Sequence, residues 1–114
     1  MKEVHELISM DEVEVFLDKN RLSSLYISRP DCSVCHALLP KLQSLLMNYP
    51  NIQLGHINAD QTEEVAAKFF VFSVPTILFM NHQREYLRTD RFVRLNELSD
   101  KIGELYDHIF GDNT

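Results

Sequence analysis

The sequence predicts an α/β fold in which a central mixed β-sheet carries helices on both faces. Short β-compatible runs alternate along the chain with longer amphipathic segments, and this alternation is typical of a sheet covered by helices. Residues 74–80 form an almost continuous apolar run, as expected of a central strand that is buried on both faces. The turn at residues 81–83 leads into a partner strand over 84–88, so the sheet contains an antiparallel hairpin and is mixed.

The first part of the chain predicts an edge strand, a helix and a second strand. Residues 4–8 are compatible with a short edge strand. Ser9 and Glu12 have the spacing of a capping box, with Ser9 as the N-cap and Glu12 at the third helical position. They predict a helix from about Met10 to Asn20. Leu22–Ser28 is a mostly β-compatible run, which we interpret as a strand.

The middle of the chain predicts helix, strand and helix in turn. Residues 33–49 carry an apolar stripe at helical spacing. Pro40 lies within this stripe, where it removes a backbone hydrogen bond and is expected to kink the helix. Residues 52–59 alternate imperfectly and are interpreted as a strand. Residues 61–70 are interpreted as a helix. The cluster Phe69-Phe70-Val71-Phe72 is expected to belong to the core and to lead into the loop before Pro75, rather than to form a partner site.

A final amphipathic helix completes the predicted order of elements. Apolar residues recur at helical spacing from Leu95 to Phe110. The elements then follow the order β-α-β-α-β-α-β-β-α. The 114 residues contain no linker, repeat or low-complexity tract, and we expect them to form one domain over residues 1–114.

Composition and charge limit the classes of function. The chain is 45% hydrophobic and 25% charged, which is the balance of a folded soluble protein. Its net charge of −6 argues against nucleic acid and an anionic membrane as partners. No stretch approaches the roughly 18 apolar residues of a membrane span, and the N-terminus has no secretory signal. We therefore expect a cytoplasmic protein, and no feature of the sequence requires a cofactor.

Cys32 and Cys35 are the two cysteines of the chain and lie three positions apart. A disulfide across so short a loop adds little stability, and in a reducing cytoplasm such a pair is more often catalytic or metal-binding. Cys32 follows the predicted strand-to-helix loop, so the unpaired amides and the dipole of the helix start favour its thiolate. Cys35 lies further into the helix and is expected to be more buried. The pattern predicts that Cys32 attacks a substrate disulfide and that Cys35 resolves the mixed disulfide.

Three charged or titratable neighbours modulate this pair. His36 lies one helical turn after Cys32 and favours the Cys32 thiolate when the imidazole is protonated. Arg29 is expected to act similarly from the loop. Asp31 directly precedes Cys32, and its negative charge opposes these effects.

A zinc site and a pair of incidental thiols are the alternatives for the two cysteines. Tetrahedral zinc needs four ligands, but the sequence has no second cysteine pair, and its histidines lack the spacing of zinc ligands. We expect no metal held within one chain, and a metal shared between two chains stays open. The histidines are His5, His36, His56, His82 and His108.

Several motifs carry a resemblance to a known family. They are Cys32-Ser33-Val34-Cys35, then Pro40, Asn58-Ala59-Asp60 and Ser73-Val74-Pro75-Thr76, with 75 − 32 = 43 positions from Cys32 to Pro75. On these residues the sequence resembles the thioredoxin family over nearly its whole length. The resemblance implies the thioredoxin fold and the reduction of disulfides.

The resemblance also implies a role for Pro75. In the family this proline follows a cis peptide bond and faces the dithiol. The Val74–Pro75 bond is therefore expected to be cis, and the backbone of Val74 to offer substrate a β-like edge. The sequence alone favours an ordinary trans proline at the start of a strand, and the resemblance reverses that expectation.

The sequence departs from the family beside the dithiol and in the substrate groove. Asp31 stands where thioredoxins have tryptophan, and the chain has no tryptophan. The groove glycine of the family falls near Arg91 or Phe92. The resemblance with these departures implies a groove that is bulkier or more charged than usual.

Two further departures concern the proton of the second cysteine. The family has a buried aspartate that helps to move this proton, and Tyr26 stands at its position. A tyrosine cannot serve as a carboxylate base near neutral pH. His56 stands at the neighbouring lysine of the family. It is either a substitute proton acceptor for Cys35 or a buried neutral histidine satisfied by one hydrogen bond.

These observations lead to two expectations of function. The first is a thiol–disulfide oxidoreductase that reduces protein disulfides through Cys32 and Cys35 and serves cell redox homeostasis. Its partners are then a disulfide-containing protein or a low-molecular-weight thiol substrate, with a reductase as electron donor. The alternative is a non-catalytic module of thioredoxin fold that binds a partner or senses redox state. The basic residues Arg84, Arg88, Arg91 and Arg94 are interpreted as a solvated face.

Overall fold

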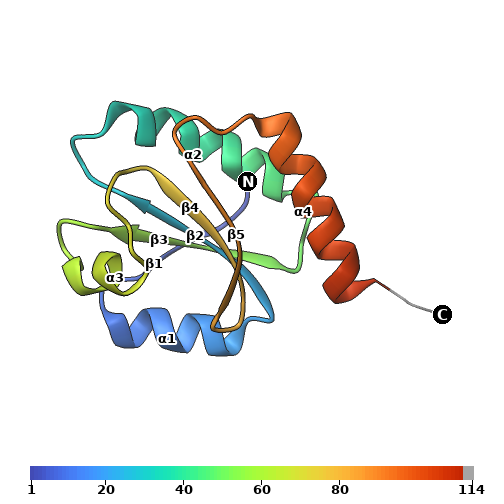
Figure 1. Cartoon of the computed structure of the whole chain (residues 1–114), viewed down its shortest axis with the longest axis horizontal. Coiled ribbons are helices and arrows are strands. Elements are labelled where there is room, and N and C mark those ends of the chain that lie inside the picture. The colour runs from blue at the N-terminus through green and yellow to red at the C-terminus, as the bar shows by residue number, and fades with distance from the viewer. Residues whose placement is uncertain (112–114) are drawn as a thin grey trace.

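The computed structural model describes residues 1–111, which form one five-stranded sheet between two pairs of helices (Figure 1). The order of elements is the predicted one. Within the described residues no helix is both long and apolar enough to cross a membrane. The elements are β1 (Val4–Glu6), α1 (Met10–Lys19), β2 (Leu22–Ser28), α2 (Ser33–Leu46), β3 (Ile52–Asn58), α3 (Glu63–Lys68), β4 (Thr76–Asn81), β5 (Arg84–Asp90) and α4 (Leu95–Phe110).

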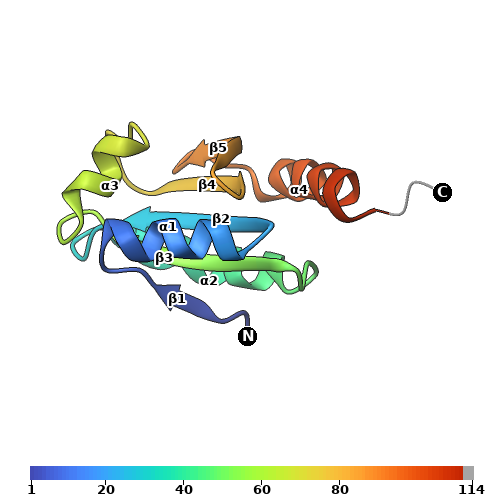
Figure 2. The same cartoon turned by 90° about the horizontal axis from the view of Figure 1, so that it is seen from below.

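The sheet is mixed, with β2 at its centre. Its strand order is β1-β3-β2-β4-β5. β2 pairs in parallel with β3 and antiparallel with β4. β1 adds to β3 in parallel at one edge, and β5 adds to β4 antiparallel at the other. Figure 2 shows these two edge strands on opposite sides of the sheet. The predicted mixed sheet, with the short N-terminal strand at an edge, is confirmed.

Two hydrophobic clusters fill the spaces above and below the sheet. Every residue of β2 is buried, and its successive side chains point to opposite faces. Tyr26 belongs to the cluster that α2 and α4 cover, whereas Leu25 and Ile27 belong to the cluster that α1 and α3 cover. The sheet is therefore covered on both faces, and the helix that begins at the cysteine pair packs on the Tyr26 side.

The start of α1 follows the predicted capping pattern with one difference. The Glu12 amide donates to Ser9 Oγ over 3.1 Å, which satisfies one of the free amides of the helix start. The Glu12 carboxylate accepts from the amide of Ile8 over 3.1 Å, one residue before the N-cap. The box is thus closed through the residue that leads into the cap.

Two helices are shorter than their apolar patterns predict. α2 ends at Leu46, and the amides of residues 47–49 bond the carbonyls three positions back in tight turns. α3 begins later than expected because the amides of residues 61 and 62 both bond the carbonyl of Asn58. The remaining ends differ from expectation by two residues at most.

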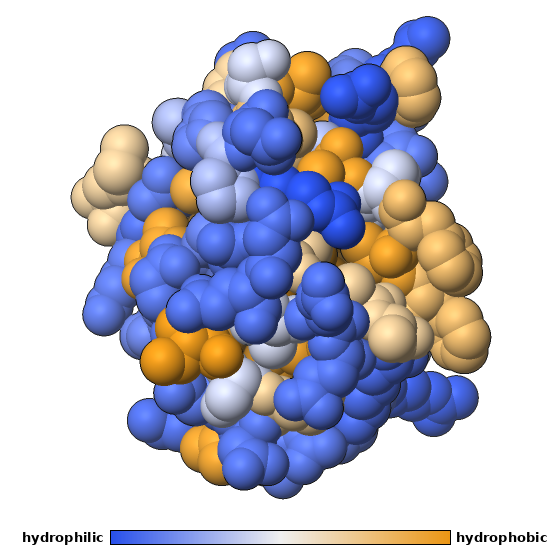
Figure 3. All heavy atoms as spheres, turned by 90° about the vertical axis from the view of Figure 1, so that its left-hand side faces the viewer, coloured by the Kyte–Doolittle hydropathy of each residue, from blue (hydrophilic) through white to orange (hydrophobic). Residues whose placement is uncertain are grey.

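The expectation that the Phe69–Phe72 cluster belongs to the core holds for Phe69 and is wrong for Phe70 and Phe72. Phe69 is buried, but Phe70 is 70% exposed and Phe72 is 90% exposed. Phe70 has a φ of 55°, so the chain leaves the helix here and turns outward. Figure 3, which faces the side of the molecule that carries α3, shows hydrophobic residues gathered toward one edge of that view.

The interpretation of the basic residues as a solvated face does not hold for Arg88, whose side chain is bonded within the protein. Its guanidinium donates to the carbonyls of Phe69 and Phe70 at 2.5 and 3.1 Å. It also pairs with the Glu85 carboxylate at 2.8 and 2.9 Å. Arg88 therefore ties the turn at Phe70 to strand β5.

Candidate active site

Cys32 and Cys35 form a disulfide at the start of α2, with their Cα atoms 5.2 Å apart. Cys32 is the N-cap residue, and its Sγ accepts from the amide of Cys35 over 3.2 Å. Cys35 is only 2% exposed, whereas Cys32 is half-buried. The helix start therefore directs a free amide at the Cys32 sulfur, which is the more reachable of the two.

The loop before the dithiol is fixed by local bonds. The amide of Cys32 bonds the carbonyl of Arg29 over 3.3 Å, which closes the turn between β2 and α2. The Arg29 side chain pairs with Asp60 at 2.8 Å. Arg29 thus joins this loop to the loop after β3.

His36 faces the same loop. It is exposed, and its Nε2 atom bonds the carbonyl of Pro30 over 2.8 Å. Because a carbonyl only accepts, Nε2 donates in this bond. This contact turns the imidazole back over the loop that precedes Cys32.

The loop before β4 carries the proline predicted to face the dithiol. The Val74–Pro75 peptide bond is cis, the geometry that the family resemblance implied. Pro75 is buried, and Val74 packs against the cluster that contains both cysteines. Thr76 Oγ1 donates to the carbonyl of Ser73 over 2.8 Å. The helix start and the proline loop therefore meet the same hydrophobic cluster.

A cavity of about 300 Å³ lies behind the disulfide, and we refer to it as the dithiol cavity. Tyr26 lies on its wall, where its hydroxyl donates to the carbonyl of Cys35 over 2.6 Å. Burial raises the pKa of Tyr26 to about 12, so the hydroxyl stays protonated and remains a donor near neutral pH. The polar residues on the wall include Glu6, Tyr26, Ser28, Cys35, His36 and His56.

His56 makes two side-chain contacts in this cavity. Its Nε2 atom lies 2.7 Å from Ser28 Oγ, and its Nδ1 atom lies 2.7 Å from Glu6 Oε1. The His56 side chain is 19% exposed. The interpretation of His56 as a buried histidine with one hydrogen bond is therefore wrong on both counts.

Glu6 and Ser28 are residues that sequence reasoning missed. Glu6 lies directly opposite His56 in the pairing of β1 with β3. Ser28 is the last residue of β2, which is the other neighbour of β3. In that pairing Tyr26 lies opposite His56. Knowledge of the strand order, with β3 between β1 and β2, would have brought the three side chains together.

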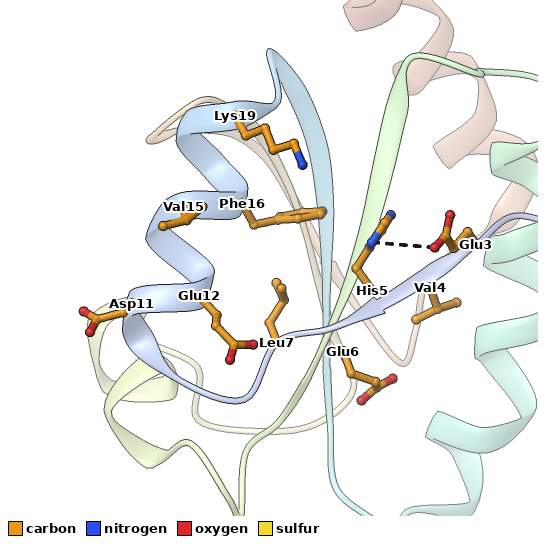
Figure 4. Close-up of a pocket in the computed structure, with 10 residues that line it drawn as sticks. All are labelled: Glu3, Val4, His5, Glu6, Leu7, Asp11, Glu12, Val15, Phe16 and Lys19. Atoms are coloured by element: carbon orange, nitrogen blue, oxygen red, sulfur yellow. Dashed lines mark ion pairs between the residues drawn. The ribbon is translucent and has the colours of Figure 1, made fainter.

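A second hollow, an open groove of about 570 Å³, runs between β1 and α1 (Figure 4). Val15 and Phe16 line it from the helix, with Asp11, Glu12 and Lys19 along the same element. In Figure 4 the His5 side chain points toward Phe16, whereas Glu6 points away from it. The groove contains neither cysteine and shares Glu6 with the dithiol cavity.

A disulfide at a helix start, with one reachable and one buried sulfur, defines a class of thiol–disulfide redox proteins. The family model described as Thioredoxin matches residues 7–104, and the chain belongs to the thioredoxin family. It is 47% identical over 106 residues to Thioredoxin-like protein YdfQ of Bacillus subtilis (strain 168). The aligned residues cover 93% of this chain and 95% of that protein.

Solved structures share the fold. Thioredoxin of Fasciola hepatica is 24% identical, with a TM-score of 0.78 over 88% of this chain and 97% of that one. Thioredoxin NaTrxh of Nicotiana alata is 22% identical, with a TM-score of 0.79 over 90% of this chain and 92% of that one. The thioredoxin fold and the redox-active cysteine pair are confirmed by these comparisons together with the family model.

Proposed function

We propose that this protein reduces disulfide bonds in protein substrates through Cys32 and Cys35. The observation that carries the proposal is the asymmetry of the pair. Cys32 caps α2 and is reachable, whereas Cys35 is 2% exposed. An amide directed at Sγ and the positive end of the helix both stabilise a thiolate at Cys32.

The exchange proceeds in two balanced steps. The Cys32 thiolate attacks one sulfur of the substrate disulfide, and the other substrate sulfur leaves as a thiolate that takes up a proton. Cys35 then loses its proton and attacks Cys32 Sγ. The Cys32–Cys35 bond forms, the bond between Cys32 and the substrate breaks, and the second substrate thiol is released. The substrate gains two electrons and two protons, which the dithiol loses.

The substrate binds against the proline loop in this proposal. Val74 precedes Pro75 and offers its backbone as an edge that pairs with an extended substrate segment. The oxidised protein is returned to the dithiol by a reductase, or by a low-molecular-weight thiol, in a reducing cytoplasm. Mixed disulfides with such a small thiol form a second class of substrate for the same pair.

Turnover of a protein disulfide tests the proposal. Reduction of insulin by this protein with a small dithiol as electron source is expected to be lost in Cys32→Ser. Cys35→Ser is expected to accumulate a covalent adduct between Cys32 and the substrate. Ser33→Ala, an exposed change between the two cysteines, is the matched control and is expected to retain turnover. Turnover no faster than that of the free dithiol, with both thiols accessible, would contradict the proposal.

A second candidate function is a partner-binding or redox-sensing module. The exposed rings of Phe70 and Phe72, at 70% and 90%, favour it because they precede the proline loop and are available for contact. This candidate predicts that Cys32→Ser leaves partner binding and biological effect intact. The pH dependence of Cys32 alkylation separates the two candidates. A midpoint well below that of free cysteine supports catalysis, and an ordinary midpoint supports the binding module.

A further inference from the structure

We propose that Glu6, His56 and Ser28 form a hydrogen-bonded relay that accepts the proton of Cys35 during resolution of the mixed disulfide. The inference rests on the proposed function and adds the groups that activate its second step. His56 is the proton acceptor of the relay. Glu6 and Ser28 are positioning residues, because they act through His56.

The need for such a relay follows from the burial of Cys35. A thiol attacks a disulfide only as a thiolate, and burial among apolar groups disfavours the charged form. Cys35 is 2% exposed and belongs to the cluster covered by α2 and α4. A proton acceptor that shares a cavity with this thiol therefore speeds its attack on Cys32.

The contacts of His56 leave Nε2 as the ring nitrogen that can accept a proton, on the Ser28 side of the cavity. The Glu6 carboxylate only accepts, so the 2.7 Å contact places the imidazole proton on Nδ1. Nε2 then has a free lone pair and accepts from the Ser28 hydroxyl over 2.7 Å. A proton that enters at Ser28 Oγ can pass to Nε2 as the hydroxyl proton moves on. The imidazolium that results is held by Glu6.

The dithiol cavity connects Cys35 with this relay. Both ends line the same space of about 300 Å³, which is large enough for water, and Tyr26, Ser28 and His56 offer polar partners on its wall. The Cys35 thiol gives its proton to the relay through this space. Its sulfur lone pair forms the bond to Cys32, and the electron pair of the broken bond leaves on the substrate sulfur.

The other titratable groups on the cavity wall are less suited to this role. Tyr26 uses its proton to donate to the carbonyl of Cys35. Arg29 is a cation paired with Asp60. His36 is exposed and directs Nε2 at the carbonyl of Pro30. The Glu6 carboxylate is already engaged with His56 and its side chain is 63% exposed.

Stopped-flow mixing of the reduced protein with the aromatic disulfide dithiobis(nitrobenzoate) separates the two steps. The first coloured thiolate reports the attack by Cys32, and its rate depends on reagent concentration. The second reports the internal attack by Cys35, and its rate does not. His56→Gln is expected to slow the second phase about 100-fold near neutral pH and to leave the first phase unchanged. It is also expected to change the pH profile of the second phase, because glutamine cannot take up the proton of Cys35.

Glu6→Gln provides a second variant at a mostly exposed position. Glu6→Gln removes the carboxylate that holds His56 with Nε2 toward Ser28, so the second phase is expected to slow several-fold. His5→Gln is the matched control. This histidine lies on the same strand but contacts Gln53 and Phe16 outside the dithiol cavity, and both phases are expected to stay unchanged.

Three results would overturn the relay. One is a second phase in His56→Gln with the rate and pH profile of the unchanged protein. Another is loss of the second phase in His36→Gln but not in His56→Gln, which would identify His36, on the loop side of the cavity, as the proton acceptor. The third is a second phase that depends on reagent concentration, because Cys35 would then not attack internally. A missing first phase in the unchanged protein would overturn the proposed function, and the relay with it.

Discussion

Replacement of Tyr26 by phenylalanine tests how a buried hydroxyl supports the dithiol helix. The Tyr26 hydroxyl donates to the carbonyl of Cys35 over 2.6 Å, and the side chain is 1% exposed. Phenylalanine keeps the ring and its packing but removes this bond. A hydrogen bond of this kind contributes about 1 kcal/mol net, so Tyr26→Phe is expected to lower the free energy of unfolding at neutral pH by about 1 kcal/mol.

Alkaline pH is expected to reverse this comparison. Burial raises the pKa of Tyr26 from 10.0 to about 12, so between these values the folded chain keeps a proton that the unfolded chain has lost. The stability that this group contributes is complete below the lower value and is lost as the pH rises through the higher one. At about pH 11 the loss amounts to about 1.4 kcal/mol, the equivalent of one pKa unit. Tyr26→Phe lacks this loss and is expected to match or slightly exceed the unchanged protein there.

Urea unfolding of both proteins, with the disulfide closed, measures the two differences. The remaining tyrosines and the lysines are common to both chains, so their titration cancels in the comparison. Tyr86→Phe is the control, because Tyr86 is 43% exposed, and it is expected to stay within about 0.5 kcal/mol of the unchanged protein at either pH. A stability gap between Tyr26→Phe and the unchanged protein that is constant from neutral to alkaline pH would refute the reasoning.

The remaining predictions concern the elements that hold the site in place. Ser9→Ala removes the cap of α1 and is expected to cost about 1 kcal/mol in urea unfolding, whereas Ser9→Asp is expected to retain most of that stability. Gly55→Ala places a methyl group 2.6 Å from Leu7 Cδ1, and an overpacking cost of about 1–3 kcal/mol is expected; a neutral result would show that Leu7 moves aside. Glu85→Gln is expected to speed proteolytic cleavage near Phe70 with less than about 1 kcal/mol of global destabilisation, because Glu85 positions the Arg88 guanidinium on the carbonyls of Phe69 and Phe70. The hydrogen bond from Arg88 lowers the pKa of Glu85, so cleavage of the unchanged protein is expected to rise only at acid pH, as that carboxylate takes up a proton.

Much of the fold could be predicted because its elements have simple periodicities. The central apolar run, which covers most of β4, and the stripe of α4 each carry one dominant pattern, and both elements lie within two residues of where the sequence places them. The ends of α2 and α3 could not be predicted from the same patterns. They depend on individual amide bonds in turns, such as those to the carbonyl of Asn58. The outward turn at Phe70 depends on a left-handed residue, which an apolar sequence does not reveal.

The residues of the candidate site likewise include some that could be predicted from the sequence and some that could not. Cys32 and Cys35 could be found because their spacing is local and chemically distinctive. Glu6 and Ser28 could not, since each is an ordinary polar residue near the end of its own strand. They contact His56 only because β3 lies between β1 and β2 in the sheet, and no local sequence pattern predicts that strand order.

The position of Tyr26 has a consequence for the unfolded chain. It lies opposite His56 on one neighbouring strand and opposite Ile77 on the other, 56 − 26 = 30 and 77 − 26 = 51 positions away. Pairings over such separations form only when long loops close. Until then Cys32 and Cys35 are ordinary thiols with equal access to solvent. The ratio of their alkylation rates therefore reports when a newly made chain has assembled its sheet.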